Sequence, residues 1–284
     1  MKYYKEIIIE KCIKLVAMST ISILILIIFF IFRQGVPFLV KYGLPNFILG
    51  QKWLPQENIF GILPMIIGSL WVTIGALIIG VPIGVACAIY LVEFSGKHTK
   101  LFFKPAIELL AGIPSVVYGF IGIMVLAPFI RSNFGGSGLS VLTASIVLGI
   151  MILPTIVSIS IDALSTVPLS YKEGSIAMGA TNWQTIVMVL LPAARSGILA
   201  GVILGMGRAI GETMAVIMVT GNSLKIPSSA LDSTRTMTSN IALEMGYALG
   251  DHRAALFATA VILFIFILLL NIITMTVIKS KKTR

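Results

Sequence analysis

The sequence predicts an all-α membrane protein with six transmembrane helices and both termini in the cytoplasm. Hydrophobic residues make up 57% of the 284-residue chain and charged residues only 11%, with a mean hydropathy of +1.03. Soluble domains carry about 25% charged residues, so this composition excludes an ordinary soluble protein. Runs without charge recur along the chain, and each approaches or exceeds the ~20 residues that cross a bilayer as a helix.

The first predicted span is the uncharged run 15–32, which follows a basic N-terminal segment. Its length exceeds the roughly 7–15 residues of a cleavable signal peptide's apolar region, and no small-x-small cleavage site follows. We therefore expect it to be retained as the first helix. The other uncharged or nearly uncharged runs predict the remaining spans: 58–92, 109–130, 132–161, 196–224 and 254–278.

The segments between the spans differ in character. The segment 35–57 is rich in Pro and Gly and is expected to be a loop, with Trp53 as an interfacial anchor. The segment 221–253 is polar at first and then amphipathic, because Ile241, Met245 and Leu249 recur at helical spacing. We expect a short helix there, lying on or dipping into the membrane surface.

The distribution of positive charge predicts the orientation. Of the 21 Lys and Arg residues, 13 fall on the side of the two termini, 7 on the other side, and Arg208 within a span. Because cytoplasmic loops are enriched in Lys and Arg, both termini and the loop 163–195 are predicted to be cytoplasmic. The same rule explains the net charge of +10 without invoking nucleic acid.

Several site types find no support in the sequence. No Gly-rich phosphate-binding loop with its Lys-Ser/Thr is present, so the chain is not expected to bind ATP, and no catalytic set can be assembled. His98 and His252 fall in loops on opposite sides, which argues against a metal site. No cofactor is implied. No internal repeat is apparent, so an inverted-repeat secondary transporter gains no support.

A patterned polar segment, Tyr171–Pro192 (YKEGSIAMGATNWQTIVMVLLP), lies in the predicted cytoplasmic loop. Ser170 can cap a short helix in which Glu173 favours the positive end, and Gly179 is expected to end that helix. Pro192 is expected at the start of the next span. A patterned loop of this kind is a candidate docking surface, and the alternative is an ordinary capped interfacial helix without a partner.

A second constellation lies in the fifth predicted span, where Arg208 and Glu212 stand four residues apart and would share one helix face. A charge inside a span costs about 2.5–3.5 kcal/mol on insertion scales, so such residues normally face a cavity or a partner. Arginine suits oxyanions because its planar guanidinium offers two parallel hydrogen bonds. One interpretation is a mutually neutralising pair. The other is a translocation path in which Glu212 holds or releases Arg208. Glycines at four-residue spacing, which permits close helix approach, surround the pair: Gly201, Gly205, Gly207 and Gly211.

These segments resemble known families. The spacing of Glu173, Gly179 and the final Leu191-Pro192 resembles the EAA loop of ATP-binding-cassette (ABC) importer permeases, with two small residues, Gly174 and Ser175, in place of two alanines. GRAIGETMAV (207–216) and AGIPSVVYGF (111–120) are similar to permeases of the phosphate-specific transport system, and TSNIALEMG (238–246) favours its C-type subunit. The GIPS portion would bend a helix and free a carbonyl, although a simple packing kink at Pro114 is the alternative.

The resemblance implies a type I ABC importer permease fold and a set of partners. These are an A-type permease, two ATPase subunits on the cytoplasmic side and an extracytoplasmic phosphate-binding protein, in the plasma membrane of a prokaryote. The coupling residues implied are Glu173, Gly174, Ser175, Ala177 and Gly179, and the residues assigned to the path or gate are Pro114, Ser115, Arg208, Glu212 and Thr213. The expected division is an N-terminal segment 1–60, a permease domain 61–279 and a basic tail 280–284.

The sequence leaves two alternatives to a phosphate importer permease. Within the class, the cargo could be another tetrahedral oxyanion, such as sulfate or molybdate, because one arginine does not choose among them. From a different class, the chain could be an ion-coupled carrier or channel in which Glu212 is a proton or cation site.

Overall fold

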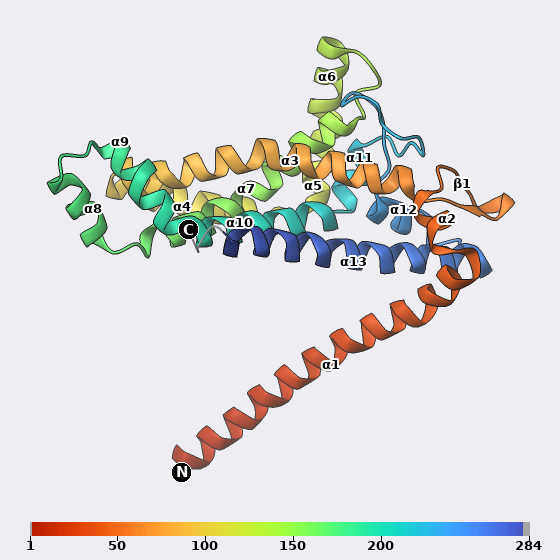
Figure 1. Cartoon of the computed structure of the whole chain (residues 1–284), viewed down its shortest axis with the longest axis horizontal. Coiled ribbons are helices and arrows are strands. Elements are labelled where there is room, and N and C mark those ends of the chain that lie inside the picture. Colours follow the sequence, from red (N-terminus) through yellow and green to blue (C-terminus); the bar gives the residue numbers. More distant parts are fainter. Residues whose placement is uncertain (1, 281–284) are drawn as a thin grey trace.

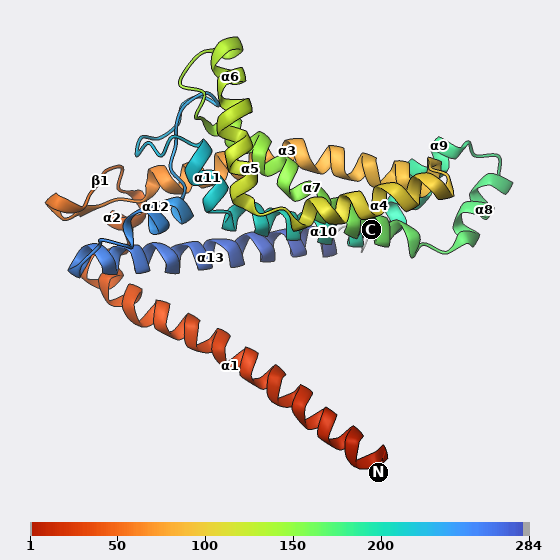
Figure 2. The ribbon, with the colours of Figure 1, turned by 180° about the vertical axis from the view of Figure 1, so that it is seen from behind.

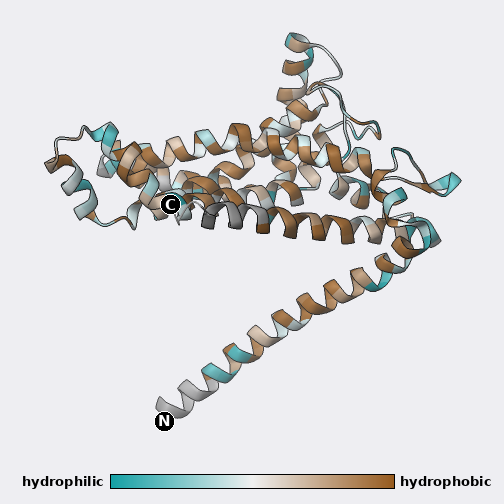
Figure 3. Cartoon of the chain, in the orientation of Figure 1, coloured by the Kyte–Doolittle hydropathy of each residue, from teal (hydrophilic) through white to brown (hydrophobic). Residues whose placement is uncertain are grey.

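A computed structural model describes the backbone of residues 2–280, and the predicted basic tail falls almost entirely outside this range (Figure 1). The described residues form a helical protein, as predicted. They include six helical segments long and apolar enough to cross a membrane: Ile9–Tyr42, Leu63–Phe94, Ser115–Phe134, Val141–Ser165, Asn182–Gly211 and Gly250–Ile272. Apolar residues dominate these helices, whereas the hydrophilic residues gather near the ends of the molecule (Figure 3).

The elements follow one another as helices with one small hairpin. The helices are α1 (Lys2–Tyr42), α2 (Leu44–Leu49), α3 (Leu63–Ile89), α4 (Lys97–Gly112), α5 (Ser115–Ile121), α6 (Ala127–Phe134), α7 (Val141–Ser165), α8 (Leu169–Ala177), α9 (Asn182–Thr185), α10 (Leu191–Gly211), α11 (Met214–Val219), α12 (Met237–Glu244) and α13 (Gly250–Ser280). The hairpin pairs β1 (Trp53–Leu54) antiparallel to β2 (Ile59–Phe60), with Trp53 opposite Phe60.

Helices α3, α7 and α10 form the centre of the bundle, with α7 the most buried (Figure 1). Glycines bring these helices together. A Cβ at Gly84 of α3 would lie 2.8 Å from the Ile156 side chain of α7, and one at Gly205 of α10 would lie 3.1 Å from the same side chain. The four-residue spacing of Gly201 and Gly205 therefore does serve close packing. Positions 207 and 211 face open space instead.

Helix α1 is longer than predicted and leaves the bundle. It continues through Pro37 to Tyr42, so the first part of the predicted 35–57 loop is helical. Its N-terminal half diverges from the other helices, and its described side chains there are exposed (Figures 1 and 2). Near its other end it crosses α13 closely, because a Cβ at Gly35 would lie 2.7 Å from the carbonyl oxygen of Phe257.

The fifth span lies earlier in the sequence than the predicted 196–224, because the helix runs from Asn182 to Gly211. Pro192 is inside this helix, which corrects the expectation that it marks the start of the span. A π-helical turn at Ile186–Leu190 directly precedes the proline. Its wider ring accommodates a residue that cannot donate a backbone hydrogen bond, so the helix continues.

The third span is also displaced from its predicted range, 109–130. The helix breaks at Ile113 and Pro114, as the GIPS motif predicted, and the span proper begins at Ser115. Helix α4 precedes the break and packs against α7, and α5 packs against α11, whereas α6 projects from the bundle (Figure 2).

A second core lies where α1, the hairpin and α13 meet. Trp53 is only 2% exposed and packs edge-on against Phe60, which corrects the expectation of an interfacial anchor. The predicted short helix in 221–253 exists as α12, but it turns a different face inward. Its buried residues are Met237, Thr238, Ser239, Asn240 and Glu244, rather than the predicted apolar stripe. This face is turned inward because Glu244 finds polar partners inside the protein.

Candidate functional site

Helix α8 forms a lobe with α9 at the end of the bundle opposite the hairpin (Figure 1). None of its residues is buried. The helix begins at Leu169 after Pro168, with no side-chain cap, so the predicted capping role of Ser170 is wrong. Because Ser170 already lies inside the first turn, its hydroxyl is not in the N-cap position.

Gly179 ends α8, as predicted. Its φ of +85° lies in the left-handed region that glycine adopts without strain. The Gly179 amide donates to the Ile176 carbonyl over 2.9 Å, and the Ala180 amide donates to the Ser175 carbonyl over 3.2 Å. This pair of bonds is the Schellman motif, which satisfies the carbonyls left open at a helix end.

Two side-chain contacts connect α8 to the bundle. Lys172 Nζ lies 2.6 Å from Glu93 Oε2 at the end of the α3 span, where the Glu93 side chain is only 11% exposed. Ser175 Oγ lies 3.0 Å from Thr185 Oγ1, at the start of the fifth span. Glu173 is exposed and a Cβ at Gly174 would meet nothing within 4 Å. The helix thus presents a free face outward while it is held to two spans.

Arg208 and Glu212 are not neighbours on one helix face, which corrects the predicted i,i+4 arrangement. Helix α10 ends at Gly211, and Glu212 has an extended backbone with φ −68° and ψ 130°. Glu212 Oε1 instead accepts a hydrogen bond from the Ala215 amide over 3.1 Å and so caps α11. Among the described residues, Arg208 has no carboxylate within ion-pair distance, which removes the interpretation as a mutually neutralising pair.

The two helix breaks meet in one core. Helix α5 follows the break at Pro114, α11 follows the break at Glu212, and the two short helices pack together because Gly119 allows Ala215 to approach. Tyr118 donates its hydroxyl to the Leu110 carbonyl over 2.8 Å, which satisfies a carbonyl on the far side of the first break.

The predicted path residues occupy this region. Tyr118 also lies within electrostatic reach of the Arg208 guanidinium, so Arg208 lies near the break that begins at Pro114. Ser115 opens α5 and is half-buried, and Thr213 donates its hydroxyl to the Gly211 carbonyl over 3.2 Å at the second break. The structure therefore brings the two predicted motifs, which are distant in sequence, to one place.

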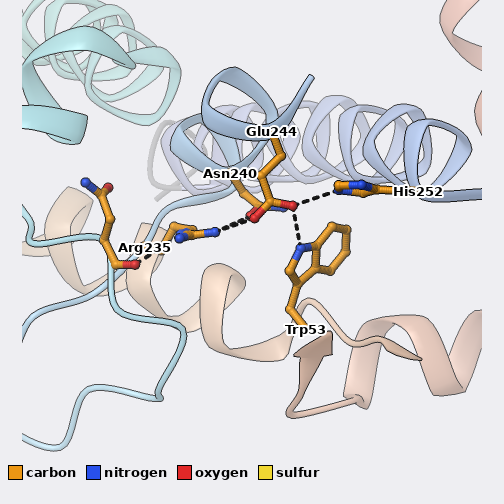
Figure 4. A network of polar contacts seen from close by, with 6 residues as sticks. Trp53, Arg235, Asn240, Glu244 and His252 are labelled. Atoms are coloured by element: carbon orange, nitrogen blue, oxygen red, sulfur yellow. Dashed lines mark hydrogen bonds and ion pairs between the residues drawn. The ribbon is translucent and has the colours of Figure 1, made fainter. Parts of the chain in front are cut away.

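A buried polar network lies at the end of the bundle with the hairpin (Figure 4). The Glu244 carboxylate accepts hydrogen bonds from Trp53 Nε1 over 2.7 Å and from an Arg235 terminal nitrogen over 2.7 Å, and it lies 2.8 Å from His252 Nε2. Arg235 also donates to Asn240 Oδ1 over 3.0 Å and to the Asn222 carbonyl over 3.1 Å. One carboxylate on α12 thereby contacts the hairpin, the loop that precedes α12, and α13.

No sequence pattern predicted this network. Its members stand far apart in the chain, and each looked like an ordinary loop or interfacial residue. The available signal was Glu244, a lone acidic residue in an otherwise apolar turn. The described residues hold no group of three or more His, Cys, Asp or Glu residues able to bind a metal.

The chain matches a known family over most of its length. The family model described as "Binding-protein-dependent transport system inner membrane component" matches residues 80–281. The probable ABC transporter permease protein YqgH of Bacillus subtilis is 49% identical over 205 residues, which cover 71% of this chain and 66% of that protein, slightly under two thirds. The phosphate transport system permease protein PstC of Mesorhizobium japonicum is 37% identical, covering 79% of this chain and 75% of that protein. A probable PstC of Methanocaldococcus jannaschii is 32% identical, covering 93% and 90%.

Solved structures share the fold. An inward-facing structure of the MetNI methionine ABC transporter superposes with a TM-score of 0.58 and 20% identity, covering 78% of this chain and 94% of that chain. An amino acid ABC transporter with histidines gives a TM-score of 0.55 and 18% identity, covering 77% and 93%. At these identities the likeness shows the fold alone. The sequence relatives, the fold and the six apolar spans agree: the chain belongs to the binding-protein-dependent transport system inner membrane components, as a multi-pass, PstC-like permease of an ABC importer.

Proposed function

We propose that this chain is the C-type permease subunit of an importer that carries inorganic phosphate across the plasma membrane of a prokaryote. The observation that carries the proposal is Arg208, a cation in the last turn of a spanning helix without a carboxylate partner among the described residues. An unpaired charge inside a spanning helix is costly unless a cavity, a partner or a ligand compensates it. The relatives named as phosphate permeases support phosphate as that ligand.

The geometry around Arg208 favours an anion over a cation as cargo. Glu212 is engaged in capping α11, so its carboxylate leaves the positive charge of Arg208 uncompensated. A guanidinium binds a tetrahedral oxyanion through two parallel hydrogen bonds. We assign Arg208 to the path, with Glu212, Thr213, Pro114 and Ser115 forming its wall at the two breaks.

The partners follow from the same assignment. An A-type permease would complete the path, and an extracytoplasmic binding protein would deliver phosphate. Two ATPase subunits would bind on the cytoplasmic side and carry out all hydrolysis, so this chain performs no chemistry. The excess of Lys and Arg on one side supports a cytoplasmic location for both termini and for α8. The division into 1–60, 61–279 and 280–284 belongs to this proposal.

Helix α8 is proposed as the element that receives the motion of the ATPase. Glu173, Gly174, Ser175, Ala177 and Gly179 would form or shape the face that lies in the ATPase cleft. The Lys172–Glu93 ion pair passes a displacement of α8 to α3, and the Ser175–Thr185 contact passes it to the fifth span. That span ends at Gly211, with Arg208 in its last turn, so the docking helix and the path residue are connected through one helix.

Labelled phosphate uptake into proteoliposomes containing the complete importer tests the proposal. Arg208→Ala is expected to reduce uptake at least about tenfold, because a charge-assisted bond contributes more than about 1.4 kcal/mol. Arg208→Lys should retain part of the activity, and Arg131→Ala in α6 is the control. Undiminished uptake in Arg208→Ala would overturn the role of this residue.

The same vesicles separate the alternatives. Phosphate uptake should require ATP and persist when proton and sodium gradients are collapsed. Uptake that depends on a gradient instead would favour an ion-coupled carrier. Competition by sulfate or molybdate as strong as that by unlabelled phosphate would reassign the cargo.

A further inference from the structure

A groove of about 450 Å³ lies at the end of the bundle that carries the hairpin. One wall comes from the segment that enters β1, and the other from the segment after Asn222. Its lining residues are Gln51, Lys52, Trp53, Leu54, Leu224, Lys225 and Ile226. The groove therefore combines an apolar interior with one lysine on each wall.

The two lysines carry charge that the described residues do not neutralise. Lys52 and Lys225 are exposed, and neither makes an ion pair within the described chain. Lys41, at the same end of the molecule, differs because it pairs with Asp251 over 2.6 Å. The groove is thus a positively charged surface on which, within the described chain, no acidic residue is paired with either lysine.

The apolar interior of the groove is accessible from outside. Leu54 and Ile226 are each 38% exposed, although each belongs to a segment that also contributes to the buried core. Apolar side chains placed between two charges are typical of the centre of an interface, where a partner's side chain fills a pocket inside a polar rim. A free phosphate ion would gain nothing from these apolar walls.

The floor of the groove is rigid. Trp53 is 2% exposed, packs against Phe60 and donates its indole N–H to the buried Glu244. Arg235 holds the opposite wall by donating to the carbonyl of Asn222. A pre-organised pocket of this kind lowers the entropic cost of ordering the site when a partner binds.

The floor is also connected to the second helix break. Glu244 belongs to α12, and Thr238 of the same helix donates its hydroxyl to the Glu212 carbonyl over 3.0 Å. A partner seated on the groove would therefore press on a helix that contacts the end of the Arg208 helix.

We propose that this groove is a docking site for the extracytoplasmic binding protein, which seats there an apolar side chain flanked by acidic residues. The inference rests on the proposed function, since it needs a binding protein that delivers cargo to this end of the chain. The two unpaired lysines favour acidic residues in the partner, and the leucine and isoleucine walls favour an apolar side chain between them.

The test measures ATPase activity of the reconstituted importer against the concentration of phosphate-loaded binding protein. Lys52→Glu combined with Lys225→Glu is expected to raise the half-saturating concentration about tenfold, because like charges then face each other across the contact. The maximal rate should be recovered at high binding-protein concentration. Arg131→Glu reverses an exposed charge on α6, away from the groove, and is expected to leave the curve unchanged (Figure 1).

A photo-crosslinking residue supplies a second readout that does not depend on charge. Placed at Ile226, it should form a covalent adduct with the purified binding protein, and the adduct should disappear in the double lysine variant. Placed at Ile23 on the exposed part of α1, it should form none.

These experiments distinguish failure of the proposed function from failure of the proposed docking groove. A wild-type importer that the binding protein does not stimulate would contradict the proposed function itself. Normal stimulation of the double variant, or an equal loss in Arg131→Glu, would overturn the groove alone. Protection of Lys52 and Lys225 from amine-modifying reagents by free phosphate, without the binding protein, would replace docking by an anion site.

Discussion

The indole nitrogen of Trp53 and the carboxylate of Glu244 lie 2.7 Å apart, although 191 positions separate the two residues in the sequence. The carboxylate also binds Arg235 and His252, and its own side chain is 9% exposed. Glu244 therefore fixes the relative positions of the hairpin, α12 and the start of α13. If the carboxylate were removed, the side chains of Trp53, Arg235 and His252 would each lose a polar partner in a largely apolar core.

Replacing Glu244 should destabilise this end of the protein. Glu244→Gln keeps the size of the side chain but leaves the buried Arg235 without its anion, at a cost of about 3 kcal/mol in the free energy of unfolding. Thermal unfolding of the purified protein in detergent would show the loss. Glu57→Gln is the control, because Glu57 is exposed in the hairpin turn. An equal effect of the two substitutions would contradict the structural role of Glu244.

The Trp53 contribution can be separated by a double-mutant cycle. Trp53→Phe keeps one aromatic ring but removes the indole N–H and the second ring of a buried side chain. The lost hydrogen bond contributes about 1 kcal/mol to the free energy of unfolding, and the lost packing adds to it. Combined with Glu244→Leu, which removes both carboxylate oxygens, the two losses should be less than additive, because both substitutions remove the same hydrogen bond. Full additivity in the unfolding free energies would argue that the bond contributes little.

The two glycines of α8 should respond differently to alanine. Gly179 has a φ of +85°, so Gly179→Ala strains the helix end by about 1 kcal/mol or more. Gly174 is inside the helix, where alanine is better tolerated by up to about 1 kcal/mol. We expect Gly179→Ala to reduce retention of the ATPase subunit during purification and Gly174→Ala to preserve it. The reverse order would contradict the proposed docking geometry.

The Lys172–Glu93 ion pair offers a charge-swap test of coupling. Lys172→Glu places two carboxylates together at a contact where Glu93 is largely buried, and it should lower ATP-driven uptake several-fold. The swapped pair, Lys172→Glu with Glu93→Lys, should restore most of it. The pair is partly exposed and contributes only about 0.5 kcal/mol to stability, so the protein should remain folded in each variant. Failure of the swap to restore uptake would argue against transmission through this contact.

The loop before α12 should loosen in acid. Hydrogen bonds from the Ser228 hydroxyl and from the backbone amides of Ser228 and Ser229 hold the pKa of Asp232 below its usual value. A carboxyl with a lowered folded pKa contributes stability above its unfolded pKa and loses it as the pH falls through the folded value. The loop also caps α7, because the Leu142 amide donates to the Ala230 carbonyl over 2.7 Å.

Hydrogen exchange at the Leu142 amide measures this change. After correction for the intrinsic rate, exchange should accelerate below about pH 4, the usual range of an aspartate. Asp232→Asn should show fast exchange at every pH, whereas Asp251→Asn should behave as the wild type. Exchange that stays slow in acid would show that the carboxylate does not hold the loop.

The features that the sequence predicted well are those set by local chemistry. Apolar runs located six spans, the Gly-Ile-Pro-Ser motif located a helix break, and Gly179 located a helix end. Each depends on residues that are close together in the sequence. A spanning helix must bury its backbone polar groups internally, so an apolar run of sufficient length has few alternatives.

The predictions that were wrong concern features that depend on contacts between distant parts of the chain. Pro192 suggested a helix start, but the π-helical turn before it lets the helix continue. Glu212 suggested a helical neighbour of Arg208, but α10 ends one residue earlier. The Glu244 network joins segments that no sequence pattern links, since hydrogen bonds between distant residues leave no periodic signal. The orientation of the termini and the roles of the coupling and path residues stay predictions.

The π-helical turn has a consequence for how motion can travel along the fifth span. A π turn contains one more residue than an α turn, and one residue corresponds to a rotation of about 100° around the helix axis. Thr185, which contacts α8, and Arg208, which lies at the far end, are therefore set out of phase by this single turn. A displacement of α8 would therefore reach Arg208 through a helix whose two ends differ in phase by about 100° from those of a continuous α-helix.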